Sequence, residues 1–214
     1  QRVLRTRALT VCFLEGHGEF SMDGFEFHTH LEGVADHGHG DASSKIIETA
    51  GHGVGRLRRV LEAQGYATAK LLLATAGAVP GDCSVVLVAN PRTTFLPAES
   101  AALRSYLASG GSALLMLDLG FVPEAGLSSL LSDIGVRLEQ QVVVDPLSHY
   151  QRDAEMVAVT GYDPHPITRT LSLTFFPGIR PLTLTRPAAG VEVTPILLSS
   201  RDSYTRPVAP AEAR

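Results

Sequence analysis

Four short apolar runs constrain the fold of this chain more than any other feature of its sequence. They cover residues 9–14, 69–73, 84–89 and 113–117. The run at 84–89 is apolar after its first residue, a pattern typical of a strand buried on both faces of a parallel sheet. Amphipathic stretches at 54–64 and 97–109 predict helices between the runs. Strands that alternate with helices predict right-handed crossovers, and therefore a three-layer α/β domain of the flavodoxin-like kind with a mostly parallel sheet.

The second of these helices has clear boundaries. Pro97 stands in its first turn, and Glu99 favours the positive end of the helix dipole. Gly110 and Gly111 end it. A further helix is predicted at 127–134, ended by Gly135.

The chain changes character after Asp145. A strand is predicted at 136–144, after which prolines recur, with short β-like runs at 155–160, 181–185 and 194–199. We expect these to be extra, partly antiparallel C-terminal strands at the edge of the sheet. The predicted organisation is a single α/β domain over residues 1–205, with a His/Gly-rich insertion or loop at 20–53 and a disordered tail at 206–214.

Composition disfavours some classes of function. A net charge of -4 disfavours nucleic acid as a partner, because phosphate binding needs clustered Lys and Arg. Two cysteines, Cys12 and Cys83, lie in apolar runs, and we expect two buried thiols rather than a disulfide framework. No run is long enough for a membrane helix. Both ends resemble boundaries inside a longer protein, so the lack of a membrane helix does not argue against a location at a membrane.

Polar residues follow three of the predicted strands, at 16–19, 90–94 and 118–120. In open α/β sheets, ligands bind at the carboxyl ends of the strands, where the strand order reverses. The sequence therefore predicts a ligand-binding rim, formed by His17, Glu19, Asn90, Arg92 and Asp118. An alternative stays open, in which Asn90 and Asp118 cap turns and the neighbouring glycines supply positive φ angles.

Six of the eight histidines lie between residues 17 and 52. The spacing of four of them resembles a metal-binding tract, in which the candidate ligands are His28, His30, His37 and His39. The alternative is a solvated loop that takes up a divalent metal only incidentally. We therefore expect no resident cofactor.

The sequence carries no recognisable nucleophile motif. Neither Gly-x-Ser-x-Gly nor Gly-x-Cys-x-Gly occurs, and the run at 113–117 ends in Asp118-Leu119-Gly120. Asp118 could act as a base, but no paired acid can be assigned. Gly16-x-Gly18 lacks the third glycine of a dinucleotide fingerprint, so a nucleotide site is not expected.

Several motifs occur together in a characteristic order along the chain. They are Gly16-His17-Gly18-Glu19, Asn90-Pro91-Arg92 through Leu96, Glu99, Tyr106-Leu107, Gly110-Gly111, Asp118, His165-Pro166-Ile167-Thr168, Phe176-Pro177, Leu197-Leu198-Ser199-Ser200 and Ser203-Tyr204. This order resembles the auxiliary component of uncharacterised ABC-type transport systems, the type associated with bacterial gliding motility. The resemblance extends from about residue 9 to residue 204.

The resemblance implies a fold like that of class I glutamine amidotransferases. It also implies a domain at the extracytoplasmic (periplasmic) face of a bacterial membrane, usually tethered by helices outside this segment, with permease and ATPase subunits as partners. Active amidotransferases of this fold have a nucleophilic Cys at the strand-to-helix elbow, which this chain lacks. The His-rich segment also departs from the shorter link usual in the family.

We therefore expect a non-enzymatic binding or scaffold domain that uses the rim to hold a partner or a small polar or sugar ligand. A second hypothesis is a hydrolase acting on a carbohydrate or glycan, with Asp118 or Glu19 as base and metal on the histidines. A third is a module that forms a homodimer through the apolar runs after Asp145.

Overall fold

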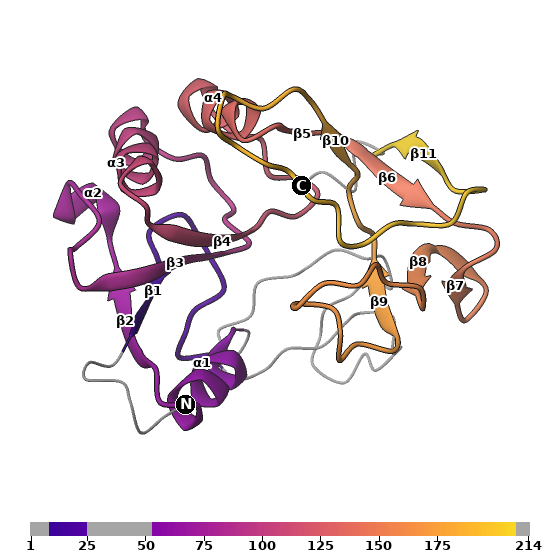
Figure 1. Cartoon of the computed structure of the whole chain (residues 1–214), viewed down its shortest axis with the longest axis horizontal. Helices are drawn as coiled ribbons and strands as arrows, with labels where there is room; N and C mark the ends of the chain where they lie inside the picture. Colours follow the sequence, from indigo (N-terminus) through magenta and orange to yellow (C-terminus); the bar gives the residue numbers. More distant parts are fainter. Residues whose placement is uncertain (1–8, 25–52, 209–214) are drawn as a thin grey trace. The chain divides into compact units, whose positions relative to one another are not determined.

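The computed structural model describes residues 9–24 and 53–208 (Figure 1). These residues form two compact units, the first containing 9–24 and 53–130 and the second 131–208. The single domain expected from the sequence stays a prediction. No helix in the described ranges is long and apolar enough to cross a membrane. The four candidate metal ligands His28, His30, His37 and His39 lie outside the described residues.

The first unit is built on a parallel sheet of four strands in the order β2-β1-β3-β4. The strands are β1 (Thr10–Leu14), β2 (Ala67–Leu71), β3 (Cys83–Ala89) and β4 (Ser112–Met116). All three pairings between neighbours are parallel. The α/β class and the parallel sheet predicted from the four apolar runs are thus confirmed, with the second run beginning and ending two residues earlier than expected.

Helices cover both faces of this sheet. The covering helices are α1 (Gly55–Ala63) and α3 (Pro97–Ala108); the chain also forms the single-turn α2 (Leu73–Ala76) after β2 and α4 (Ala125–Asp133) after β4. From β1 to β2 the chain moves across the sheet in one direction, and from β3 to β4 it moves in the other. Right-handed crossovers in opposite directions place their helices on opposite faces, so α1 and α3 lie on opposite sides of the sheet (Figure 1).

The core of the first unit lies on both faces of its central strands. On one face, Leu57 and Leu61 of α1 pack against Val11 and Phe13 of β1 and against β3. On the other face, Val86 and Val88 of β3 are fully buried. Successive side chains of a strand point to opposite faces, so burial of both sets confirms β3 as a strand covered on both sides.

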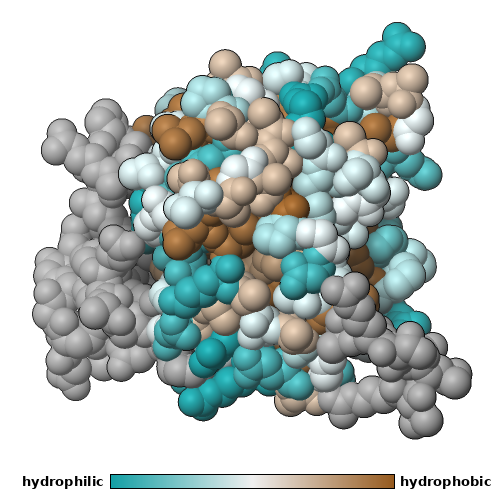
Figure 2. Space-filling view, turned by 90° about the vertical axis from the view of Figure 1, so that its left-hand side faces the viewer, coloured by the Kyte–Doolittle hydropathy of each residue, from teal (hydrophilic) through white to brown (hydrophobic). Residues whose placement is uncertain are grey.

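Some apolar residues remain at the surface. Figure 2 views the molecule from the left-hand side of Figure 1 and shows apolar residues gathered near the middle of this face, with polar residues around them. In the first unit, three exposed apolar side chains follow the carboxyl ends of strands, namely Leu72 after β2, Leu96 after β3 and Val122 after β4. Apolar surface is therefore present at the edge where the sequence predicts the rim.

The insertion predicted at 20–53 begins and ends at one place in the fold. Ser21 and Gly53 form a parallel bridge. The Val54 amide donates to the Ser21 carbonyl at 2.9 Å, and the Gly55 amide donates to the Gly24 carbonyl at 2.8 Å. The two ends of the segment are thus held together at the start of α1.

Gly53→Ala is expected to lower the free energy of unfolding by about 2 kcal/mol, since overpacking against backbone cannot be relieved by a rotamer change. A Cβ at this position would overlap the Ser21 carbonyl oxygen and would lie 2.6 Å from that of Gly24. Urea unfolding measures the effect. Gly81→Ala is the matched control, because its Cβ would enter open space. Equal stability of the two variants would contradict the close approach at Gly53.

The second unit consists of small antiparallel sheets. Its strands are β5 (Val136–Leu138), β6 (Gln141–Val144), β7 (His149–Tyr150), β8 (Asp153–Val159), β9 (Thr174–Pro177), β10 (Leu182–Leu184) and β11 (Tyr204–Pro207). They form three sheets, β10-β5, β11-β6 and β7-β8-β9. The runs predicted at 155–160 and 181–185 correspond to β8 and β10.

Four sequence-based expectations about this region need correction. The C-terminal strands form sheets of their own and do not extend the parallel sheet. The strand predicted at 136–144 is two strands, because β5 pairs with β10 while β6 pairs with β11. Residues 194–199 contain no strand, in keeping with Pro195, which cannot donate to a ladder. Strand β11 continues to Pro207, past the expected start of the tail at residue 206.

Asp145 holds two segments of the second unit together, at the position after which prolines recur in the sequence. Its carboxylate is fully buried and accepts hydrogen bonds from the Leu147, Ser148 and Ser200 amides and from the Ser200 hydroxyl, at 2.7 to 3.2 Å. Burial alone would raise the pKa of this carboxyl group, but the hydrogen bonds from Ser200, Ser148 and Leu147 outweigh it and lower the pKa. Asp145 therefore joins the end of β6 to a segment 55 residues later.

Candidate functional site

The five predicted rim residues lie together at the carboxyl edge of the parallel sheet. His17 and Glu19 follow β1, Asn90 and Arg92 follow β3, and Asp118 follows β4. These three strands are neighbours, and the chain changes direction across the sheet between β1 and β3. The five residues thus meet at one edge of the sheet, as the sequence predicts; their role in binding stays a prediction.

Backbone hydrogen bonds join the loops after β1 and β3. The carbonyl of His17 accepts from the amides of Arg92 at 2.7 Å and Thr93 at 3.0 Å. The Phe20 amide donates to the Ala89 carbonyl at 2.8 Å. The position of His17 therefore fixes the loop that carries Arg92.

The side chain of His17 lies between two buried carboxylates. Its Nδ1 is 2.9 Å from Glu19 Oε1, and its Nε2 is 2.8 Å from Glu99 Oε2. The three residues are 6%, 9% and 3% exposed, respectively. Phe95 packs against the imidazole, with the ring centroids 4.5 Å apart. We call Glu19, His17 and Glu99 the triad.

Each carboxylate of the triad also accepts a hydrogen bond from a backbone amide. Glu19 Oε2 accepts from the His17 amide at 2.7 Å, and Glu99 Oε2 accepts from the Leu96 amide at 2.8 Å. Leu96 immediately precedes α3, so Glu99 satisfies an amide at the amino end of that helix while it binds the imidazole. The triad thereby ties the loop after β1 to the start of α3.

The hydrogen bonds of the triad favour a protonated imidazole. A neutral ring has a single N–H, whereas an imidazolium donates from both nitrogens. Burial alone would lower the pKa of His17, but the hydrogen bonds to Glu99 and Glu19 and the charges of both outweigh it and raise the pKa above its ordinary value of 6.5. The triad thus stabilises the imidazolium form of His17 relative to an ordinary histidine.

Asn90 and Asp118 make local contacts at the same edge. Asn90 has a left-handed backbone with φ of 55°, a conformation that Asn tolerates better than most residues. Its side-chain amide lies 3.5 Å from Asp118 Oδ2, and Asp118 Oδ1 accepts from the Leu119 amide at 2.7 Å. These contacts fit the alternative in which both residues organise turns.

Arg92 is the rim residue most open to solvent. Its side chain is exposed, and its guanidinium carbon lies 5.8 Å from the centre of the Phe20 ring. Thr93 and Thr94 beside it are also exposed. The accessible part of the rim is therefore this loop after β3, whereas His17 and Glu19 lie beneath it as support.

The arrangement limits what the triad can do chemically. Both ring nitrogens of His17 face carboxylates, so the ring could accept a substrate proton or bind a metal only after an ion pair breaks. Within the described ranges, no three His, Cys, Asp or Glu residues are placed to hold a metal ion. The geometry therefore favours a structural role for the triad.

Sequence reasoning missed the role of Glu99. Its position near the start of a helix indicates an interaction with the helix dipole, and this contact is present. Its second contact, with a histidine 82 residues earlier, depends on the loops after β1 and β3 meeting. Knowledge that β1 and β3 are neighbours would have been needed to predict it.

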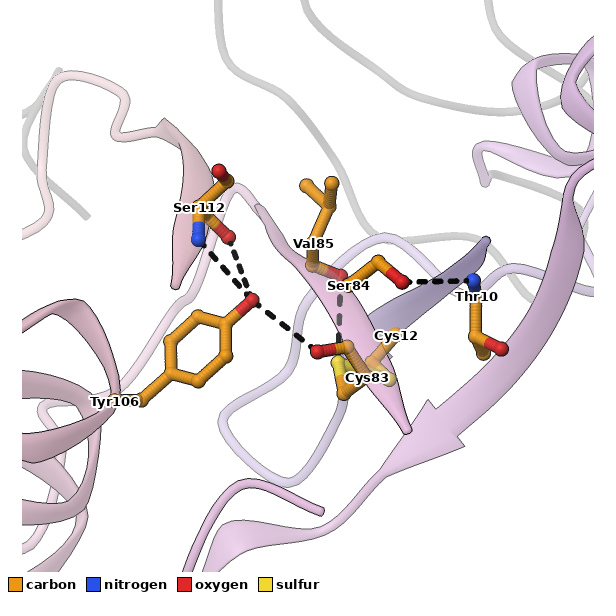
Figure 3. The surroundings of a disulfide bond; sticks show 7 residues. All are labelled: Thr10, Cys12, Cys83, Ser84, Val85, Tyr106 and Ser112. Carbon is orange, nitrogen blue, oxygen red and sulfur yellow. Dashed lines mark hydrogen bonds between the residues drawn. A yellow bond between two sulfur atoms is a disulfide. The ribbon is translucent and has the colours of Figure 1, made fainter. Parts of the chain in front are cut away.

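A disulfide joins the middle of β1 to the start of β3, the end of that strand opposite the rim (Figure 3). Cys12 of β1 and Cys83 of β3 are bonded, with their Cα atoms 5.9 Å apart. The expectation of two buried thiols is therefore wrong. Its physical reason is that the two cysteines lie on neighbouring parallel strands, a pairing that their positions in the sequence do not indicate.

Tyr106 of α3 forms hydrogen bonds with the first residues of β3 and β4. Its hydroxyl accepts from the Ser112 amide at 3.2 Å and lies 3.1 Å and 3.4 Å from the carbonyl oxygens of Ser112 and Cys83 (Figure 3). A covalent bond thus joins β1 to the start of β3, and hydrogen bonds of Tyr106 join the starts of β3 and β4.

Comparison with known proteins identifies a similar fold. The solved structure of the mmIFT52 N-terminal domain is 22% identical to this chain and has a TM-score of 0.57, over 77% of this chain and 74% of that one. At this level of identity the likeness concerns the fold alone. No curated protein matches the chain.

A family profile gives the assignment. The profile described as "ABC-type uncharacterized transport system" matches residues 9–213, which include both compact units. The resemblance inferred from the order of the motifs is thus confirmed at the level of the family. The chain belongs to this family and is an auxiliary component of an ABC-type transport system.

Proposed function

We propose that this chain is a non-enzymatic binding or scaffold domain at the extracytoplasmic face of a bacterial membrane. In this proposal, its rim contacts the permease of an assembly that also contains an ATPase. The gliding-motility type and a flavodoxin-like or class I glutamine amidotransferase-like fold are part of the same proposal, and the strand order β2-β1-β3-β4 supports the latter.

The observation that carries the proposal is that both ring nitrogens of His17 are bound by carboxylates in a chain that belongs to this family. The imidazole of the rim is held by Glu19 and Glu99, at 2.9 Å and 2.8 Å, and supports the loop above it. A general base must be within reach of the proton that it removes, whereas this ring is 6% exposed. Such a rim suits recognition better than catalysis.

The exposed residues at the strand ends favour a protein as the partner. Leu72, Leu96 and Val122 are 50%, 56% and 59% exposed, and each follows the carboxyl end of a strand of the first unit. Arg92 adds a guanidinium to this edge. Aromatic residues, Met and Arg beside apolar side chains are typical of the surfaces through which proteins bind one another.

The disulfide supports the proposed location. Disulfides form and persist in the periplasm and outside the cell, and they are rare in the reducing cytoplasm. Cys12 and Cys83 are 4% and 6% exposed, so their bond is protected within the first unit.

Co-purification tests the proposal. The protein is captured from solubilised membranes of its native host, and its partners are identified by mass spectrometry. A permease and an ATPase of one ABC system are the expected partners. Recovery of the protein alone, at a yield that retains other membrane complexes, would contradict the proposed assembly.

Substitution at the rim tests the docking surface. Arg92→Ala combined with Asp118→Ala is expected to reduce the recovered permease at least about tenfold, the effect of losing a small group of interface contacts. Arg169→Ala, an exposed residue of the second unit, is the control. Unchanged recovery with the double variant would show that the rim does not hold the assembly.

A further inference from the structure

We propose that His17 is a positioning residue of the rim. As an imidazolium held between Glu19 and Glu99, it fixes the loop after β1 and, through its own carbonyl, the loop that carries Arg92. Loss of the ring proton then loosens both loops. The part of this inference that concerns binding rests on the proposed function, whereas the part that concerns the loops does not.

The contacts form a continuous path from the ring to the exposed loop. The imidazole is fixed from two sides, by Glu19 of its own loop and by Glu99 of α3. The carbonyl of the same residue accepts the amides of Arg92 and Thr93. Any shift of the His17 backbone therefore changes the hydrogen bonds of the loop after β3.

Deprotonation of the His17 ring removes one of the two hydrogen bonds that hold it. A neutral ring donates from one nitrogen only, so its other nitrogen presents a lone pair to a carboxylate. The remaining pair of buried carboxylates then lacks a cation between them, which is costly in a buried environment. Among the described residues, the charged side chains that face the ring are Glu19 and Glu99, and the ring of Phe95 packs beside it.

The direction of the pH effect follows from the pKa of His17. Because its folded-state pKa is raised above 6.5, the ring keeps its proton to a higher pH than an ordinary histidine does and loses it as the pH rises through that raised pKa. The rim is thus expected to be ordered in mildly acidic solution and to loosen as the pH rises through the folded-state pKa of His17. An ordinary exposed histidine would lose its proton at a lower pH.

The experiment uses the labelled full chain and needs no partner. NMR of the histidine ring nitrogens is recorded from about pH 5 to about pH 9, together with amide hydrogen exchange corrected for its intrinsic pH dependence. We expect His17 to titrate above its ordinary value, and the protection of the Arg92 and Thr93 amides to fall roughly tenfold over the same interval. Glu99→Gln should move both changes to lower pH, and His165→Gln should move neither.

Two outcomes would overturn the inference. One is a His17 ring that is neutral at pH values where the Arg92 and Thr93 amides remain fully protected. The other is a titration that is unchanged by Glu99→Gln in a variant whose amide spectrum shows that it is folded. A purely structural role for His17 would change stability without coupling the protection of these amides to the titration of the ring.

Co-purification at mildly acidic and at alkaline pH separates this inference from the proposed function. If the loops loosen as expected while recovery of the permease is unchanged, the rim is not the docking surface and the inference about the loops still holds. If recovery depends on Arg92 while the ring does not titrate as expected, the docking surface holds and the positioning role is wrong.

Discussion

Reduction of the Cys12–Cys83 disulfide is expected to lower the free energy of unfolding by about 4 kcal/mol. The two cysteines are 71 residues apart in the sequence, and closing a loop of this length in the unfolded chain accounts for an effect of this size in the chain-entropy model. The bond joins neighbouring strands of the parallel sheet, so the first unit should be the part that loses stability.

Urea unfolding of the same protein with and without reductant measures this effect. Mass spectrometry after alkylation verifies the state of both thiols. The variant that combines Cys12→Ala with Cys83→Ala is the control, and its stability should not respond to reductant. Equal midpoints for verified oxidised and reduced protein would contradict a stabilising role for the bond.

His17→Gln is expected to have the second largest effect, a loss of about 3 kcal/mol near pH 6, because removal of the cation leaves two buried carboxylates facing each other. The difference from wild type should depend on pH. The folded-state pKa of His17 is raised, so the stabilisation is complete below its unfolded value of about 6.5 and is lost as the pH rises through the folded value.

Urea titrations of both proteins across this pH range give the comparison. His165→Gln in the second unit is the matched control and should follow wild type throughout. A difference between wild type and His17→Gln that grows from neutral to alkaline pH would have the wrong sign and would exclude an imidazolium as the stabilising species.

Local patterns in the sequence were sufficient to predict the parallel sheet. The run that became β3 is apolar after Ser84 because both faces of that strand are buried, and the helix that became α3 carries its start signals at Pro97 and Glu99. These features depend on residues close together in the chain. The second unit was harder to predict because its short strands pair over long separations, as β11 does with β6.

Part of the candidate site could likewise be predicted from local patterns in the sequence, and part could not. The edge of the sheet that carries His17, Arg92 and Asp118 follows from a general rule about parallel sheets, and the sequence located it. The partners of His17 and of Cys12 do not follow from any local pattern. Both depend on β1 and β3 being neighbours, a consequence of the strand order that the apolar runs alone do not define.

Site-specific cross-linking in living cells tests the central claim most directly. A photo-reactive amino acid replaces Thr93 on the exposed loop of the rim or, as a control, Asp82, which immediately precedes β3 at the other end of the strands. We predict that the probe at residue 93 cross-links to the permease of an ABC transport system and that the probe at residue 82 does not. Equal cross-linking from both positions, or cross-linking only from residue 82, would contradict the claim that this chain serves its transport assembly through the rim.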